Sequence, residues 1–101
     1  MIKKNVTRGI SENVTVCEFG KGDIIVADAY IEEHNIGCVM LSNDVPKEIG
    51  TEHPELKGKT TDEINHDVIM QFTSIESIDV VIRALGRSKS NMLAKTQLNK
   101  A

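Results

Sequence analysis

Hydrophobic and polar residues alternate over four short segments of the chain, and this period of two predicts β-strands. The segments are 14–19, 24–32, 36–41 and 67–72. In the second segment the odd-numbered positions from 25 to 31 are apolar, and the even-numbered positions from 26 to 32 share the other face. Residues 20–23 have the composition of a turn and residues 33–35 fit a short loop. We therefore expect the first three strands to form an antiparallel meander and 67–72 to add a fourth strand.

Apolar residues then recur at helical spacing. They are Ile75, Ile78, Ile82 and Leu85, with Val81 beside them. This stripe predicts an amphipathic helix that ends near Leu85. Thr73 and Glu76 have the spacing of a capping box, and Gly86 stands where a C-terminal cap is expected. Residues 87–101 hold further apolar positions, so a continued helix and a disordered end both stay open.

These elements predict one α+β domain over residues 1–101, a small antiparallel sheet of about four strands with the C-terminal helix packed on one face. The chain has only three aromatic residues, so its core must be aliphatic. The sheet face away from the helix carries Val26, Tyr30, Val39 and Leu41. Because that face is too apolar to stay in water, we expect the protein to be a homo-oligomer.

The formal net charge of −3 conceals an acidic body between basic ends. Residues 1–8 and 87–101 contain lysines and arginines but no acid, and we expect them to be mobile ends. Residues 9–86 hold all 15 acids against five bases, a net charge of −10. A nucleic-acid reader needs a clustered basic face and aromatic residues for base stacking. Nucleic acid is therefore disfavoured as a partner.

Cysteine content and hydropathy bear on the compartment. Cys17 and Cys38 are the only cysteines, and neither belongs to a zinc-binding spacing. Two thiols without a secretory signal favour a reducing, cytoplasmic setting. No apolar run approaches the ~18–20 residues of a membrane span, so no membrane association is expected.

Residues 42–66 form the least regular stretch, and such long connections are usually functional or mobile. Gly58–Thr61 has the sequence Gly-Lys-Thr-Thr, which resembles the end of a phosphate-binding loop, but His53 stands where that loop requires glycine. A weaker form of the hypothesis remains, because Thr60 and Glu63 predict a capped short helix whose free amides attract an anion. The candidate ligand-binding residues are Lys57, Lys59, Thr60, Thr61 and His53. The alternative is a capped surface turn with solvated lysines.

Other chemistry has less support in the sequence. The histidines at 34, 53 and 66 lack the short spacing of a metal site, so no metal or other cofactor is expected. Both cysteines lie in predicted strands, where thiols are normally packing groups. The acids Asp28, Glu32 and Glu33 could serve acid–base chemistry, but adjacent carboxylates in an acidic protein are usually solvated. The sequence therefore favours a protein without catalytic residues.

Three functions follow from these observations, in order of preference. The first is a non-catalytic cytosolic binding protein, a homo-oligomer that holds a small phosphorylated or nucleotide-like ligand in the 50–61 loop near a subunit boundary. The second is an acidic protein-interaction module or an inhibitor of a basic partner protein. The third is a small oligomeric hydrolase that uses the histidines and acids between chains.

Overall fold

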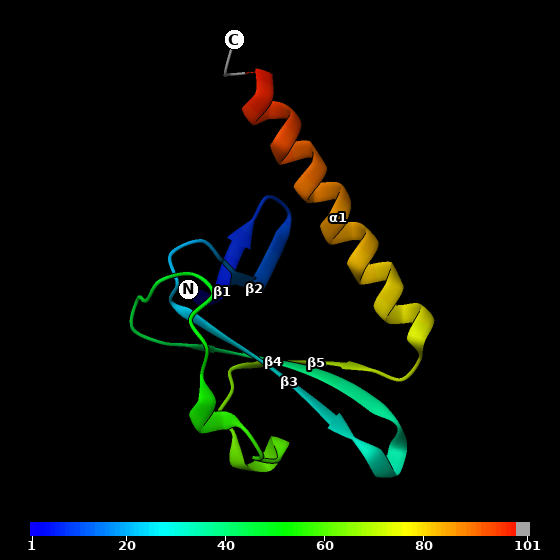
Figure 1. Cartoon of the computed structure of the whole chain (residues 1–101). Coiled ribbons are helices and arrows are strands. Elements are labelled where there is room, and N and C mark those ends of the chain that lie inside the picture. The colour runs from blue at the N-terminus through cyan, green and yellow to red at the C-terminus, as the bar shows by residue number, and fades with distance from the viewer. Residues whose placement is uncertain (99–101) are drawn as a thin grey trace. The chain divides into compact units, whose positions relative to one another are not determined.

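The computed structural model describes residues 1–98 and confirms the α+β class. The described elements are β1 (Ile2–Arg8), β2 (Ser11–Cys17), β3 (Ile24–Ile31), η1 (Glu32–His34), β4 (Ile36–Asn43), η2 (Pro54–Leu56), η3 (Thr61–Glu63), β5 (Val68–Phe72) and α1 (Ile75–Leu98), where η marks a short 3-10 helix (Figure 1). The chain divides into two compact units, Met1–Gln71 and a second that begins at Phe72. The expectation of one domain over 1–101 stays a prediction.

The strands form two sheets, whereas a single sheet of about four strands was expected. β1 and β2 make a two-stranded antiparallel ribbon, and the other sheet has the order β3-β4-β5. The predicted meander is wrong in one pairing, because β2 pairs with β1 and not with β3. The connection 20–23 is not a tight hairpin turn: its Gly22 and Asp23 carbonyls accept hydrogen bonds from the amides of Lys47 and Asp44, at 2.8 and 2.9 Å. These bonds fix β3 against the segment that follows β4.

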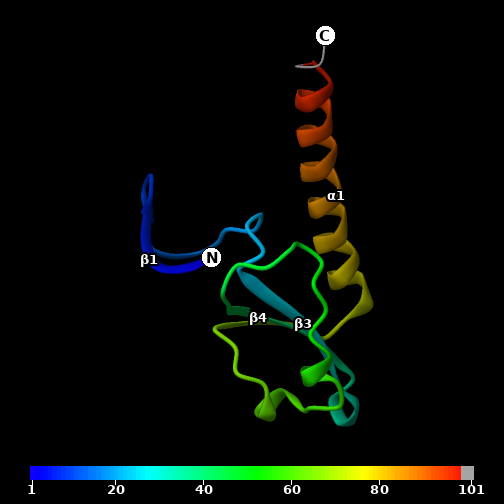
Figure 2. The same cartoon turned by 60° about the vertical axis from the view of Figure 1, so that its left-hand side comes forward.

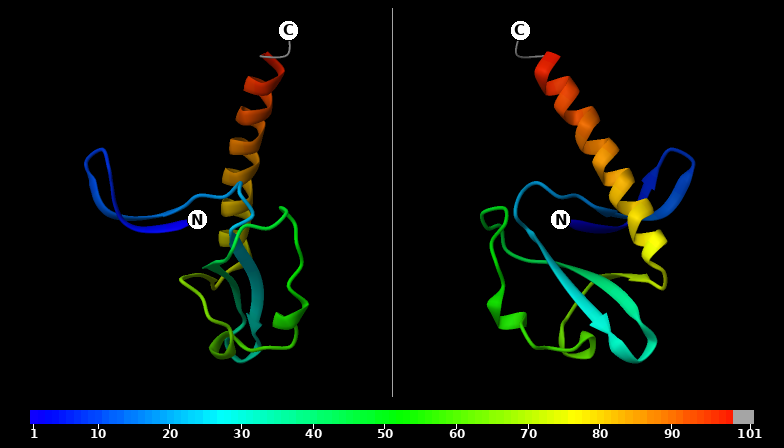
Figure 3. Two further views of the ribbon diagram at one scale, coloured as in Figure 1. Left: turned by 90° about the vertical axis from the view of Figure 1, so that its left-hand side faces the viewer. Right: turned by 45° about the vertical axis from the view of Figure 1, so that its right-hand side comes forward.

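The core of the first unit lies on one face of the β3–β4 hairpin. Ala27 pairs with Met40 and Ala29 with Cys38, so the four side chains share this face. Met40 is 1% and Cys38 3% exposed. The connection between β4 and β5 runs along β3 and β4 and supplies the buried Ile64 (Figure 3). We predicted that the helix covers this face; α1 lies in the other unit, so that packing stays a prediction.

The β1–β2 ribbon extends from the rest of the first unit (Figure 2). Its register shifts twice, and Asn5 and Asn13 adopt positive φ, a conformation that asparagine tolerates better than most residues. The base of the ribbon is held by Asn43 at the end of β4. The Asn43 side chain accepts a hydrogen bond from the Ile2 amide at 2.7 Å and donates one to the Ile2 carbonyl at 3.2 Å.

The helix α1 differs from its prediction at both ends. Its first turn is capped by Ser74, because the Ser77 amide donates to Ser74 Oγ at 3.2 Å, so the Thr73–Glu76 capping box is wrong. Gly86 does not end the helix, which continues to Leu98. A glycine inside a helix costs about 1 kcal/mol, and the long helix-forming segment after it outweighs that cost.

The basic ends that we expected to be mobile are regular elements where the structure describes them. Residues 2–8 form β1, and residues 87–98 belong to α1. The rest of the predicted C-terminal end, 99–101, lies outside the described residues.

Candidate functional site

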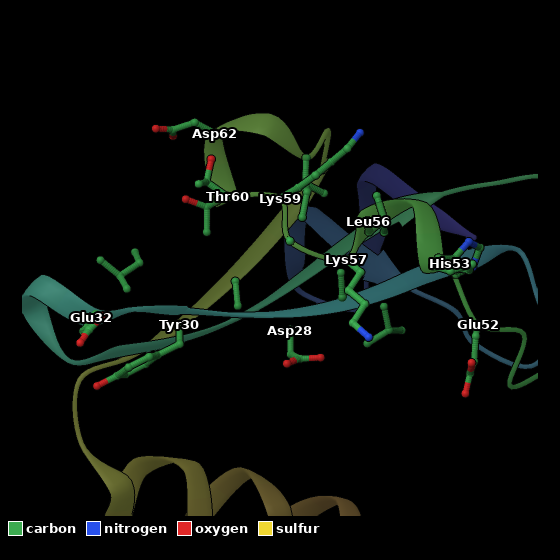
Figure 4. Close-up of a pocket in the computed structure, with 18 of the residues that line it drawn as sticks. Asp28, Tyr30, Glu32, Glu52, His53, Leu56, Lys57, Lys59, Thr60 and Asp62 are labelled. Atoms are coloured by element: carbon green, nitrogen blue, oxygen red, sulfur yellow. The ribbon is translucent and has the colours of Figure 1, made fainter.

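The first unit contains an open pocket of about 1130 Å³ between β3, η1 and the connection that follows β4 (Figure 4). All five residues predicted from the sequence line it: His53, Lys57, Lys59, Thr60 and Thr61. The structure therefore assembles the predicted residues around one concavity. Residues of β3 and η1 line the same pocket, and no pattern in the sequence had placed them in one site with the loop.

The predicted cap at Thr60 is present, and η3 begins at Thr61 as expected. The Thr60 hydroxyl donates a hydrogen bond to Glu63 Oε1 at 3.0 Å, and the Thr60 amide lies 3.5 Å from the same oxygen. The Glu63 carboxylate thus occupies the Thr60 hydroxyl, one of the donors that were expected to bind an anion. A phosphate at this position would have to displace that carboxylate against charge repulsion.

Lys57 and Lys59 flank Gly58, whose φ of +81° favours glycine. Both lysines are exposed, and neither forms an ion pair within residues 1–98. In Figure 4 their side chains point in opposite directions, so the two ammonium groups do not converge. The structure places both lysines at the pocket without building a shared phosphate cradle.

His53 lies directly before η2, and its side chain contacts Glu55. Its Nδ1 lies 3.1 Å from Glu55 Oε1, and its side chain is only 14% exposed. A backbone hydrogen bond at Glu55, together with the neighbouring His53 ring, lowers the pKa of the Glu55 carboxyl below its usual 4.5. The His53 ring therefore already has a partner within the loop, the Glu55 carboxylate.

The charged residues that line the pocket are mostly acidic. Asp28, Glu32, Glu33, Glu52 and Asp62 contribute five carboxyl groups against two lysines. None of the five forms an ion pair within the described residues. The alternation of β3 already grouped Asp28, Tyr30 and Glu32, which point to the side of β3 away from Thr60 and Asp62 in Figure 4. No local pattern predicted that the 51–62 segment lies along β3.

Apolar surface accompanies these acids. Val26 is 56% and Tyr30 63% exposed, and both line the pocket. The Tyr30 hydroxyl donates to Asn35 Oδ1 at 2.9 Å, which fixes the ring next to η1. Asn35 adopts φ +52°, the left-handed conformation that ends η1. An aromatic ring held beside free carboxylates suits a cationic, partly apolar ligand.

Within residues 1–98, a metal-binding group, a reactive cysteine or a membrane-spanning helix would be another source of function. No group of three histidine, cysteine or acidic side chains there is arranged to hold a metal ion. Cys17 is half-buried and Cys38 buried, and both are free thiols. None of the described helices has the length and apolarity needed to cross a membrane.

Comparison of the chain with protein-family models, with curated proteins and with solved structures finds no match.

Proposed function

We propose that this chain is a non-catalytic protein-interaction module whose pocket binds a basic, extended segment of a partner protein. The observation that carries the proposal is the set of carboxylates without ion pairs at Asp28, Glu32 and Glu52, which point to the same side of β3 as Tyr30 in Figure 4. Carboxylates on an open surface attract lysine and arginine side chains and speed their association. This is the second of the functions expected from the sequence.

The exposed side chains of β3 support a peptide ligand. Tyr30 and Val26 offer apolar contact to the aliphatic stems of lysine or arginine, and Asp28 lies between them in sequence. A tyrosine ring also attracts a guanidinium group placed over its face. Aromatic residues of this kind often dominate the energy of a protein interface.

A small phosphorylated or nucleotide-like ligand is the second candidate. One observation favours it, since all five residues predicted for such a ligand line the same pocket. The engagement of Thr60 by Glu63 and the excess of carboxylates weigh against it. For either ligand we place the protein in the cytoplasm, a proposal that the free thiols at Cys17 and Cys38 support.

The first experiment measures binding of a fluorescein-labelled lysine- and arginine-rich peptide by anisotropy, with an acidic peptide of equal length as control. Wild-type protein should bind the basic peptide, and added salt should weaken the complex. The variant Asp28→Asn/Glu32→Gln/Glu52→Gln should bind about tenfold more weakly, because three exposed ion pairs contribute about 0.5 kcal/mol each.

The matched control is Glu12→Gln/Glu18→Gln/Glu48→Gln, which removes three exposed carboxylates outside the pocket. It should bind like wild type. Equal losses in the control and the pocket variant would show only a general charge effect and would contradict the proposal. Absence of any salt-sensitive binding to wild-type protein would contradict it as well.

The second candidate is tested by thermal shift with nucleotides, cyclic nucleotides and inorganic phosphate. If it holds, one of these raises the melting temperature of wild-type protein, and Lys59→Ala reduces that shift. Lys21→Ala is the control, since Lys21 is exposed and lies outside the pocket. No shift with any compound would contradict the second candidate and leave the first unaffected.

A further inference from the structure

Helix α1 carries a seam of residues spaced alternately three and four apart. The seam consists of Ile75, Ile78, Ile82, Leu85, Lys89, Met92 and Thr96. This is the a/d pattern of a heptad repeat, the spacing with which one helix packs lengthwise on another. The sequence pattern predicted only the first four positions of this seam, because the helix was expected to end at Leu85.

Most of the large seam residues are exposed in the described chain. The exposed fractions are 73% for Ile75, 58% for Ile82, 65% for Leu85 and 72% for Met92. Exposed apolar side chains in a continuous row mark an interaction surface more often than scattered ones do. Around the helix from this seam, Glu76, Arg83 and Arg87 are polar.

The charges along α1 indicate which helix fits the seam. Asp79 flanks the seam one residue after Ile78, and Lys89 is itself a seam position, whereas Glu76, Arg83 and Arg87 lie on the other side of the helix. A second α1 in antiparallel orientation brings Lys89 of one helix beside Asp79 of the other. A parallel pair would instead set Lys89 against Lys89 at a seam position.

We propose that α1 pairs antiparallel with α1 of a second copy of this chain, over residues 75–92. In this alignment Ile75 lies opposite Met92, Ile78 opposite Lys89, and Ile82 opposite Leu85 of the second copy. Every seam position in the overlap then has a partner, over about 27 Å of helix. Lys89 packs its stem on Ile78, and its ammonium group comes next to Asp79 of the second copy.

This pairing goes beyond the proposed function, since it uses the second unit and none of the pocket residues. The sequence placed the expected homo-oligomer contact on the sheet face with Val26 and Tyr30, whereas this pairing uses α1. The pairing also supplies two pockets per assembly, so that a partner with two basic segments binds through both and gains effective concentration.

The first experiment measures self-association of the full chain by sedimentation equilibrium. Wild-type protein should form a dimer, and Ile82→Lys should weaken the association about 100-fold because it places an unpaired charge in the seam. Val80→Lys is the matched control, an apolar-to-lysine change at a residue that is 55% exposed on the opposite side of the helix. It should leave the association within about threefold of wild type.

Three outcomes would overturn the proposal: a monomeric wild-type chain, equal losses for the two lysine variants, or an unchanged dimer for Ile82→Lys. If the seam instead packs on the first unit of its own chain, wild type stays monomeric, and Ile82→Lys lowers the melting temperature. Circular dichroism of each variant shows whether α1 is still folded. The basic-peptide assay is independent of these results, so failure of the pairing and failure of the pocket proposal are distinguishable.

Orientation is tested by oxidative cross-linking in a Cys17→Ser background, where the remaining Cys38 is 3% exposed. The double variant Ile75→Cys/Met92→Cys should give a covalent dimer, because each introduced thiol meets its counterpart in an antiparallel pair. The single variant Ile75→Cys should stay uncross-linked. A covalent dimer from the single variant would show a parallel pair and overturn the antiparallel assignment.

Discussion

The two hairpins of the first unit share a hydrogen-bonding pattern and differ in what they bury. β3 and β4 pair over eight residues in unbroken register, whereas β1 and β2 pair over seven with two irregularities. β4 alone buries Cys38, Met40 and Leu41, while Ile2 is the one buried apolar side chain of the ribbon. The regularity of the strand pairing and the burial of apolar side chains therefore both distinguish the core of this unit from its extension.

The difference originates in the sequences of the strands. β4 is apolar on both faces, and one of these faces is covered by the connection with Ile64. β1 carries Lys3, Lys4 and Arg8, and after the buried Ile2 its residues are exposed apart from the half-buried Val6. A two-stranded hairpin is marginally stable by itself in water, so the ribbon must take its stability from the point where it is anchored.

The largest effect is expected from Met40→Ala. Met40 is 1% exposed, and its truncation leaves a cavity in the face shared with Ala27. The free energy of unfolding should fall by about 3 kcal/mol in urea denaturation. Val14→Ala, at a half-buried position of the ribbon, should cost less than about 1 kcal/mol. Equal losses at the two sites would contradict the distinction between core and ribbon.

The next effect concerns Gly22, at the junction between the ribbon and the sheet. Gly22 has φ +68°, and a Cβ there would lie 1.6 Å from the Lys47 carbonyl oxygen. Gly22→Ala must therefore displace the segment that holds the Lys47–Gly22 hydrogen bond, and we expect a loss of about 2–3 kcal/mol. Gly9→Ala, in the open turn of the ribbon at φ +58°, should cost about 1 kcal/mol. Thermal and urea denaturation of both variants measures the difference.

Periodicity was sufficient to predict the strands of the core sheet and the existence of the helix, because these elements bury or align apolar side chains at regular spacing. It failed for β1, where the lysines at 3 and 4 and the arginine at 8 resemble a solvated end. A ribbon stabilised by Asn43 and by pairing with β2 leaves no apolar signature. The end of α1 was missed for a related reason, since the cost of Gly86 was given more weight than the helix-forming residues after it.

The candidate site was predicted in part. The Thr60–Glu63 cap is a local pattern and was found, and the five predicted residues share one pocket. The acidic character of that pocket depends on a long-range contact, in which 51–62 lies beside β3 and η1. A single sequence does not encode that contact in any local pattern.

A smaller effect is expected from Asn43→Ala, which removes both side-chain hydrogen bonds to Ile2. Global stability should fall by about 1–2 kcal/mol, because the amide of the buried Ile2 loses its acceptor. Hydrogen exchange of β1 and β2 amides should accelerate more than that of β3 and β4 amides. Asn65→Ala, at an exposed loop position, is the control and should change neither. Uniform acceleration in both hairpins would show that Asn43 does not anchor the ribbon specifically.

The smallest effect is a dependence on acid at the open end of the β3–β4 hairpin. A hydrogen bond from the Met1 amino group, 2.9 Å away, holds the pKa of Asp23 below its usual 3.8. The Lys47 ammonium group, 3.0 Å from Asp44, lowers the pKa of the Asp44 carboxyl in the same way. A carboxyl whose pKa is lower in the folded chain than in the unfolded chain stabilises the fold at pH values above its unfolded pKa. This stabilisation is lost as the pH falls through the pKa of the folded chain. The melting temperature should therefore be constant above about pH 5 and decrease below about pH 4.

Two variants test whether this dependence of the melting temperature on acid arises at the β3–β4 hairpin. Asp44→Asn removes the titrating group and Lys47→Met removes its partner, so each should lower the melting temperature at neutral pH and flatten the decrease in acid. Asp23 precedes β3 and Asp44 follows β4, and the Asp44 amide donates to the Asp23 carbonyl. Acid should then increase hydrogen exchange first at this end of β3 and β4. An acid response that is unchanged in both variants would show that the carboxylates at this end do not contribute to the stability of the hairpin.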